Sequence, residues 1–167
     1  MSDFFLKNPI EIKIEEIALL EAVILGLDVG DKTIGVAISD RRIKIASGIT
    51  TISRNETDRD FKLLLECVRD YKIGLIVFGW PLQMNGLAGN QCEKVLKFAH
   101  QLSSFFDIPF IQWDERFSTR AVNNLMIQAD LSRKKRRKTI DQGAAVYILQ
   151  GALDFFNRQS ARTTQLT

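Results

Sequence analysis

The chain has 167 residues, a length that suits one domain able to bury about 70% of the surface of its unfolded chain. Its composition, with 46% hydrophobic and 26% charged residues and a net charge of +3, is ordinary for a soluble globular protein. No apolar run approaches the roughly 20 residues of a membrane span, and the N-terminus lacks the pattern of a signal peptide. Cys67 and Cys92 have no metal-ligand spacing, which favours free thiols. We therefore expect a cytoplasmic protein that is neither a membrane protein nor a disulfide scaffold.

The first part of the chain, residues 1–21, reads as an N-terminal extension whose structure the sequence leaves open. Residues 10–14 alternate like a strand, whereas Ile14, Ile17 and Leu20 fit a helical stripe. From Ala22 the pattern becomes regular. The polar residues 159–167 read as a flexible tail, so the predicted domain spans residues 22–158.

The middle of the chain predicts three strands, followed by alternating helices and strands. The short links between the first three strands favour an antiparallel meander. The later alternation is typical of strands joined through helices. The prediction is an α/β protein with a mixed sheet and helices on both faces. The expected strands are 23–29, 33–38, 44–53, 73–78 and 109–114, and the expected helices are 58–72, 92–106, 119–129 and 139–157.

Asp28 is the unusual residue of the first strand, which is otherwise apolar. Strand alternation puts it on the same face as Ile24 and Gly26. A lone ionised carboxylate in an apolar layer is strongly disfavoured unless it is paired or binds a cation. Gly26 and Gly30 are expected to leave room beside it for a group as large as a phosphate. The structural alternative is a salt bridge to Lys32 or the capping of a nearby turn.

Two adjacent acids, Asp114 and Glu115, end the fifth predicted strand. Successive residues of a strand point to opposite faces, so only one of the two can face Asp28. The pattern does not say which one. The other can pair with Arg116 or cap the helix that follows.

Asp141 lies in the first turn of the last predicted helix, where Thr139 and Gln142 match the spacing of a capping box. An acid at this place complements the helix dipole and needs no ligand. Asp141 and Ala145, however, flank the stripe that should face the sheet, which puts Asp141 at the rim of the core. That stripe consists of Ile140, Ala144, Ile148 and Ala152.

The acids at the ends of these three elements form an oxygen-ligand set suited to Mg²⁺ or Mn²⁺. Their segments contain no histidine or cysteine, which argues against zinc. Two such ions about 3.5–4 Å apart activate water and stabilise the leaving oxygen in phosphodiester hydrolysis. The predicted cofactor is therefore a pair of Mg²⁺ or Mn²⁺ ions.

Residues 132–138 form the densest block of positive charge, and outside this block acids outnumber bases. Adjacent like charges disfavour compact structure, so we expect a loop that stays mobile until a polyanion such as nucleic acid binds. The alternative is a solvated surface turn. Lys32 is a weaker candidate for a phosphate contact, and Trp80 and Trp113 are candidates for base stacking or, more commonly, for core packing. The basic residues of the block are Arg133, Lys134, Lys135, Arg136, Arg137 and Lys138.

The chain resembles the YqgF/RuvX family of pre-ribosomal RNA nucleases, also described as Holliday junction resolvases. The resemblance runs from about residue 24 to residue 156. It departs from the usual pattern at Thr33, Trp80 and Asn85, where arginine, leucine and aspartate are common. The motifs that carry it are 26–30 with Lys32 and 34–37; 79–82 with Asn85, Gly86 and Gly89; 114–116 with Ser118 and Thr119; and 132–136 followed by Asp141, 144–145 and 148–150.

The resemblance implies a ribonuclease H-like fold with a mixed five-stranded sheet, and it implies Asp28, Glu115 and Asp141 as the catalytic, metal-binding triad. It further implies an endonuclease that processes the 5′ end of pre-16S rRNA, a structured RNA held by Lys32 and residues 133–138.

Three alternatives stay open at this point. One is a resolvase of four-way DNA junctions, which would suit a homodimer. The second is a non-catalytic RNA-binding factor in ribosome assembly. The third is an actin-like or sugar-kinase-like ATPase, for which the chain has only one of the two lobes. The sequence leaves monomer and homodimer open.

Overall fold

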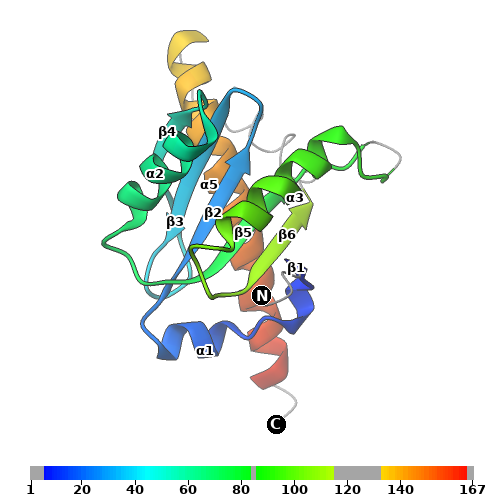
Figure 1. Ribbon diagram of the computed structural model, residues 1–167. Coiled ribbons are helices and arrows are strands. Elements are labelled where there is room, and N and C mark those ends of the chain that lie inside the picture. The colour runs from blue at the N-terminus through cyan, green and yellow to red at the C-terminus, as the bar shows by residue number, and fades with distance from the viewer. Residues whose placement is uncertain (1–5, 84–85, 115–132, 165–167) are drawn as a thin grey trace.

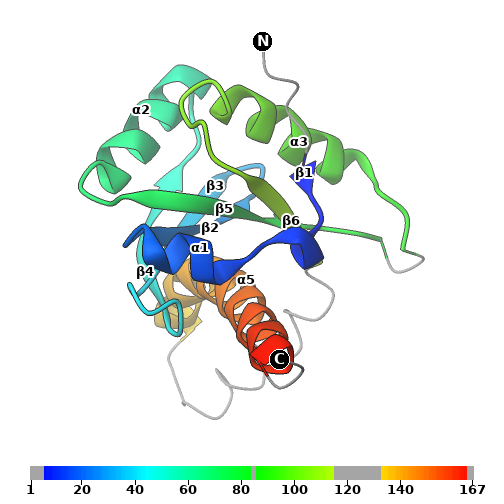
Figure 2. The same cartoon turned by 90° about the horizontal axis from the view of Figure 1, so that it is seen from below.

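The computed structural model describes residues 6–83, 86–114 and 133–164, and for residues 133–142 and 163–164 it describes only the course of the helix. A six-stranded sheet with the order β1-β6-β5-β2-β3-β4 forms the centre (Figure 1). Helices α2 (Thr57–Val68) and α3 (Asn90–Leu102) cover one face, and α5 (Arg133–Thr164) covers the other (Figure 2). Among the helices of the described ranges, none is long and apolar enough to cross a membrane.

The sheet is mixed, as the sequence predicts. Strands β2, β3 and β4 form an antiparallel meander, whereas β5 runs parallel to β2, β6 parallel to β5 and β1 parallel to β6. All five expected strands are present, and the sixth comes from the N-terminal segment. The strands are β1 (Leu6–Lys7), β2 (Val23–Val29), β3 (Thr33–Ser39), β4 (Ala46–Ser53), β5 (Ile73–Trp80) and β6 (Phe110–Asp114).

The helices expected at 58–72 and 92–106 are present as α2 and α3, and both end earlier than expected. The helix expected at 119–129 lies outside the described residues. The last helix, α5, begins at Arg133 instead of Thr139. The loop expected for the basic block and the capping box at Thr139 are therefore wrong.

The early start of α5 has a simple physical reason. Lysine and arginine are good helix formers, and no glycine or proline interrupts the chain between Ser132 and Gly143. These preferences outweigh the repulsion among the cations. As a consequence, Asp141 lies beyond the first two turns of α5 and not in its first turn.

The sheet separates two apolar layers. Under α5, Ile24, Val77 and Ile111 pack with residues of the helix, and on the other face Leu25, Leu27 and Phe78 pack with α2 and α3. The stripe of α5 that faces the sheet is rotated relative to the expected one, because Ala145 and Leu149 are fully buried whereas Ala144 is half-buried. The buried residues of α5 are Ala145, Ile148, Leu149, Ala152, Leu153 and Phe156.

The N-terminal segment adds three short elements to this fold: β1, the 3-10 helix η1 (Pro9–Glu11) and α1 (Ile14–Leu19). Ile14 and Ile17 are buried in the layer under α5. Gly74 admits α1 closely, since a Cβ on it would lie 2.9 Å from Ile17 Cγ2. The segment before Ala22 thus contributes a strand and a helix to the described structure.

Candidate active site

Asp28 lies near the carboxyl end of β2, half-buried on the face covered by α5. Ile24 belongs to the layer under α5, and Gly26 and Asp28 follow it on the same face. A Cβ on Gly26 would lie 2.7 Å from Leu149 Cβ and 3.3 Å from the carbonyl oxygen of Ala145. The missing side chain of Gly26 therefore admits α5, and the expectation that it leaves room for a phosphate is wrong.

Other glycines flank Asp28 at its own level of the sheet. Asp28 pairs with Gly35 of β3, and the register of β2 with β5, in which Leu27 pairs with Phe78, continues to Gly79. Neighbouring strands are only about 4.8 Å apart, so the nearest groups beside a residue on one face are those of its partners. Neither partner of Asp28 has a side chain. The register thus puts Gly35 and Gly79, and not Gly26 or Gly30, on the strands directly beside Asp28.

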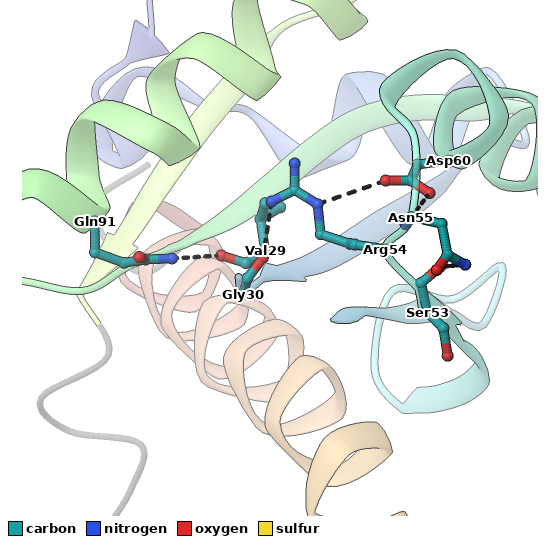
Figure 3. A network of polar contacts seen from close by, with 7 residues as sticks. All are labelled: Val29, Gly30, Ser53, Arg54, Asn55, Asp60 and Gln91. Carbon is teal, nitrogen blue, oxygen red and sulfur yellow. Dashed lines mark hydrogen bonds and ion pairs between the residues drawn. The ribbon is translucent and has the colours of Figure 1, made fainter. Parts of the chain in front are cut away.

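The turn that follows Asp28 is held by side chains from two other elements (Figure 3). Arg54, which follows β4, donates from Nη1 to the carbonyl oxygen of Gly30 at 2.8 Å. Gln91 of α3 donates from Nε2 to the carbonyl oxygen of Val29 at 3.1 Å. The backbone N–H of Arg54 also donates to the carbonyl oxygen of Lys32 at 2.8 Å. These contacts fix the end of the strand on which the Asp28 carboxylate stands.

Arg54 is in turn oriented by Asp60 of α2. Asp60 is only 2% exposed, and its Oδ2 lies 3.6 Å from Arg54 Nε. Its other oxygen accepts a hydrogen bond from the backbone N–H of Asn55 at 3.2 Å. This pair was not predicted from the sequence. The spacing of Asp60, Leu64 and Val68 was the available signal, because it puts an acid on the apolar stripe of α2.

The turn itself is exposed and carries Asp31 and Lys32. Asp31 is paired with Lys94 of α3 at 2.6 Å, and the hydrogen bond from this ammonium group lowers the pKa of the Asp31 carboxyl group. The structure places the predicted phosphate contact Lys32 on this exposed turn, beside the carboxyl end of β2.

The two other predicted triad residues are not described at the level of side chains. Glu115 lies outside the described residues, and Asp141 lies in the part of α5 for which only the course of the helix is described. Asp114 alternates with Trp113, which packs in the layer under α5, and so lies on the opposite face from Asp28. Among the residues whose side chains are described, no group of three metal-ligating residues is found. The triad stays a prediction.

The basic residues 133–138 form the first turns of α5. Figure 1 shows this part of the helix at the same end of the molecule as the carboxyl end of β2. The side chains of Arg133, Lys134, Lys135, Arg136, Arg137 and Lys138 lie outside the described part. The backbone nevertheless brings the predicted cationic segment and Asp28 to one end of the fold.

Known proteins are similar to this chain over most of its length. A family model described as "RuvX: Holliday junction resolvase" matches residues 22–155. A protein of Clostridium kluyveri named "Putative pre-16S rRNA nuclease" is 53% identical over 131 residues, which cover 78% of this chain and 96% of that protein. A Bacillus subtilis protein of the same name is 48% identical over 136 residues, covering 80% and 99%.

Solved structures show the same architecture. RuvC of Thermus thermophilus in complex with a Holliday junction substrate superposes with a TM-score of 0.57 at 15% identity, over 83% of this chain and 96% of that one. A second RuvC structure of this organism gives a TM-score of 0.50 at 11% identity, over 81% and 97%. At such identities the likeness concerns the fold, and it confirms the predicted ribonuclease H-like class.

Proposed function

The chain belongs to the RuvX family of nucleases, and from this premise we propose that it is a metal-dependent endonuclease that processes the 5′ end of pre-16S rRNA in the cytoplasm. The choice of pre-16S rRNA as the substrate is supported by the name of its relatives, "Putative pre-16S rRNA nuclease". The observation that carries the chemistry is the half-buried carboxylate of Asp28 at a strand end, with a glycine on each side and a turn fixed by Arg54 and Gln91.

We assign the catalytic and metal-binding roles to Asp28, Glu115 and Asp141. Because Asp114 of β6 lies on the face opposite to Asp28, strand alternation favours the next residue, Glu115, as the second acid of the triad. Helical periodicity puts position 141 on the same side of α5 as Ala145 and Leu149, one turn before Ala145. These two residues lie against Gly26 of β2, which supports an approach of α5 toward Asp28.

The donor set fits Mg²⁺ or Mn²⁺, since carboxylate oxygens are the ligands that these hard cations prefer. Two ions would supply an activated water and a Lewis acid for the leaving oxygen. Other residues of the chain position Asp28, one of the acids proposed to bind these ions. The turn held by Arg54 and Gln91 follows Asp28 directly, and the strand neighbours of Asp28 are the glycines 35 and 79.

Binding of the RNA backbone is assigned to Lys32 and to the cationic first turns of α5, Arg133, Lys134, Lys135, Arg136, Arg137 and Lys138. Contacts of this kind follow phosphates and not sequence, so the affinity should fall steeply with salt concentration. One protomer contains the whole proposed triad. A monomer would therefore suffice for cutting RNA, whereas a homodimer would be needed for symmetric cutting of a DNA junction.

The test is a cleavage assay with pre-16S rRNA and with a four-way DNA junction, each with and without Mg²⁺ or Mn²⁺. We expect metal-dependent cleavage of the precursor RNA, and we expect Asp28→Asn to lose cleavage while still binding RNA. Asp70→Asn is the matched control, because Asp70 is an exposed acid that pairs with Arg69 near the amino end of β2, the end opposite to Asp28. Equal activity of the Asp28→Asn protein would overturn the proposal.

The same assay separates the second candidate. The family model and the solved RuvC complex both concern Holliday junctions, so cleavage of the junction without cleavage of RNA would favour a resolvase. RNA binding by the wild-type protein without any cleavage would favour a non-catalytic assembly factor.

A further inference from the structure

A groove at the edge of the sheet takes no part in the proposed chemistry. It has a volume of about 490 Å³ and lies across the carboxyl ends of β5 and β6. Residues 6–10 of the N-terminal segment form one wall, and Trp80, Trp113 and Asp114 are among the residues that line the rest. We call it the tryptophan groove.

The groove holds both tryptophans of the chain. Trp113 is half-buried and packs against α5: its ring centroid lies 5.6 Å from that of Phe155, and a Cβ on Gly151 would come within 3.0 Å of its Nε1. Trp80 is half-buried and packs on the opposite apolar layer. Each indole is thus held by the core on one side, and this fixes its orientation at the groove.

The tryptophan groove lies two strands away from Asp28 in the register of the sheet. Gly79 lies beside Asp28 in the register of the sheet, and Trp113 pairs with Gly79 on the next strand. Two strand spacings separate Asp28 from Trp113, which is about 10 Å. A nucleic-acid strand with stacked bases covers this distance in about three nucleotides, at about 3.4 Å each.

We propose that the tryptophan groove binds an unpaired base of the RNA strand that is cut at Asp28, within a few nucleotides of the cleaved phosphate. This inference rests on the proposed nuclease function and specifies its substrate, a cleavage position flanked by single-stranded RNA. Unpaired bases stack on aromatic side chains, and nearby cations hold the backbone. Lys7 supplies such a cation at the groove, and the exposed Gln112 supplies an amide for the edge of a base.

The N-terminal segment builds one wall of the groove. Residues 1–21 precede the region that the family model matches, 22–155, and it is β1 that joins the edge strand β6 and carries the wall of residues 6–10. The N-terminal segment therefore acquires a role, because it converts an open sheet edge into a binding groove.

Tryptophan fluorescence tests this inference directly, since both fluorophores line the groove. The full-length Asp28→Asn protein is titrated with a short single-stranded RNA of the precursor sequence, and then with RNAs in which one abasic position is moved along the strand. We expect emission to be quenched on binding, and one abasic position to weaken binding about 5- to 150-fold. Fully double-stranded RNA of the same sequence should not quench.

Kinetics with otherwise wild-type protein give the second readout. Trp80→Leu and Trp113→Phe should raise KM for single-stranded substrates and leave kcat unchanged at a temperature where both variants are folded. Tyr71→Leu is the matched control, because Tyr71 is 45% exposed and does not line the groove.

Unchanged emission at saturating RNA, or an abasic series without a sensitive position, would overturn the inference. Unchanged KM in both tryptophan variants of an active nuclease would overturn it as well and leave the nuclease function intact. The wild-type protein could also cleave no substrate while RNA still quenches the emission and one abasic position still weakens binding. That outcome would support base binding in the groove and overturn the nuclease proposal.

Discussion

The two ends of β2 differ in how their surroundings are built. At the amino end, Ile24 is fully buried, and its N–H donates to the hydroxyl of Ser39 at 2.9 Å inside the protein. At the carboxyl end, Asp28 is half-buried, and its neighbours in the sheet are the glycines 35 and 79. One end is closed by apolar packing, and the other carries a half-buried charged group between two glycines.

The neighbouring strand β5 repeats this division with a glycine near each end. Gly74 meets α1 so closely that a Cβ on it would lie 2.9 Å from Ile17 Cγ2, whereas Gly79 lies beside Asp28. The same residue type thus admits a helix at one end and stands beside a carboxylate at the other. Substitutions at the amino ends should therefore change stability, and substitutions at the carboxyl ends should change cleavage.

The largest expected effect on stability is at the amino end. Ile17 is 7% exposed, and Ile17→Ala would leave a cavity between α1 and the sheet. We expect the free energy of unfolding to fall by about 2–5 kcal/mol, measured by urea denaturation. Leu19→Ala, on the same helix but 84% exposed, is the control. If the Ile17 variant loses kcat at a temperature where it is fully folded, the amino ends of the strands affect cleavage as well as stability, contrary to this expectation.

The next largest effect is expected at the carboxyl end of β2, where one substitution should lower both stability and cleavage. Arg54→Met removes the donor to Gly30 and leaves the buried carboxylate of Asp60 without its cation. We expect a loss of about 2–3 kcal/mol in unfolding free energy, less than for a fully buried pair because the Arg54 side chain is 23% exposed. Cleavage should fall by about tenfold or more, because the strand end that carries Asp28 loses a fixed contact.

The double variant Arg54→Met with Asp60→Asn separates these two contributions. It removes the uncompensated charge but does not restore the donor to Gly30. Stability should therefore recover in part, while cleavage stays low. If stability and cleavage both recover, the hydrogen bond from Arg54 to Gly30 is not needed for cleavage, and Arg54 acts on stability alone.

Local patterns were sufficient to predict most of the fold. The apolar run 23–29 and the alternation of helices and strands led to the correct mixed sheet, and the isolated charge in the first strand marked Asp28. Strand β1 has two residues, too few for any periodicity to show. The start of α5 was mispredicted because helix propensity and charge repulsion oppose each other in the basic block.

The surroundings of Asp28 could not be read from local sequence. Which glycine lies beside the carboxylate depends on the register between strands, so Gly35 and Gly79 were missed in favour of the nearby Gly26 and Gly30. Arg54 likewise reaches Gly30 only because the meander brings the end of β4 to the β2–β3 turn. Asp60, by contrast, was predictable from its place on the apolar stripe of α2.

A smaller effect is expected when a side chain is added beside Asp28. Gly35→Ala should leave the free energy of unfolding unchanged or raise it by about 0.5–1 kcal/mol, because glycine weakens a strand relative to alanine. Cleavage should nevertheless fall by roughly tenfold, since the methyl group takes space beside the carboxylate. Stability is measured by thermal melting and activity by single-turnover cleavage. A loss of both would show that Gly35 serves packing, as Gly26 does.

The smallest effect concerns Gln91, whose amide donates one hydrogen bond to Val29. Gln91→Leu should lower the free energy of unfolding by about 1 kcal/mol and kcat by a few-fold. Gln91→Glu should be worse at neutral pH, because an ionised carboxylate cannot donate to the Val29 carbonyl and repels it. A glutamic acid donates again only when protonated, so the stability difference between this variant and wild type should shrink as the pH falls through about 4. If the difference is independent of pH, the contact to Val29 does not hold the turn, and Arg54 alone must position the strand end that carries Asp28.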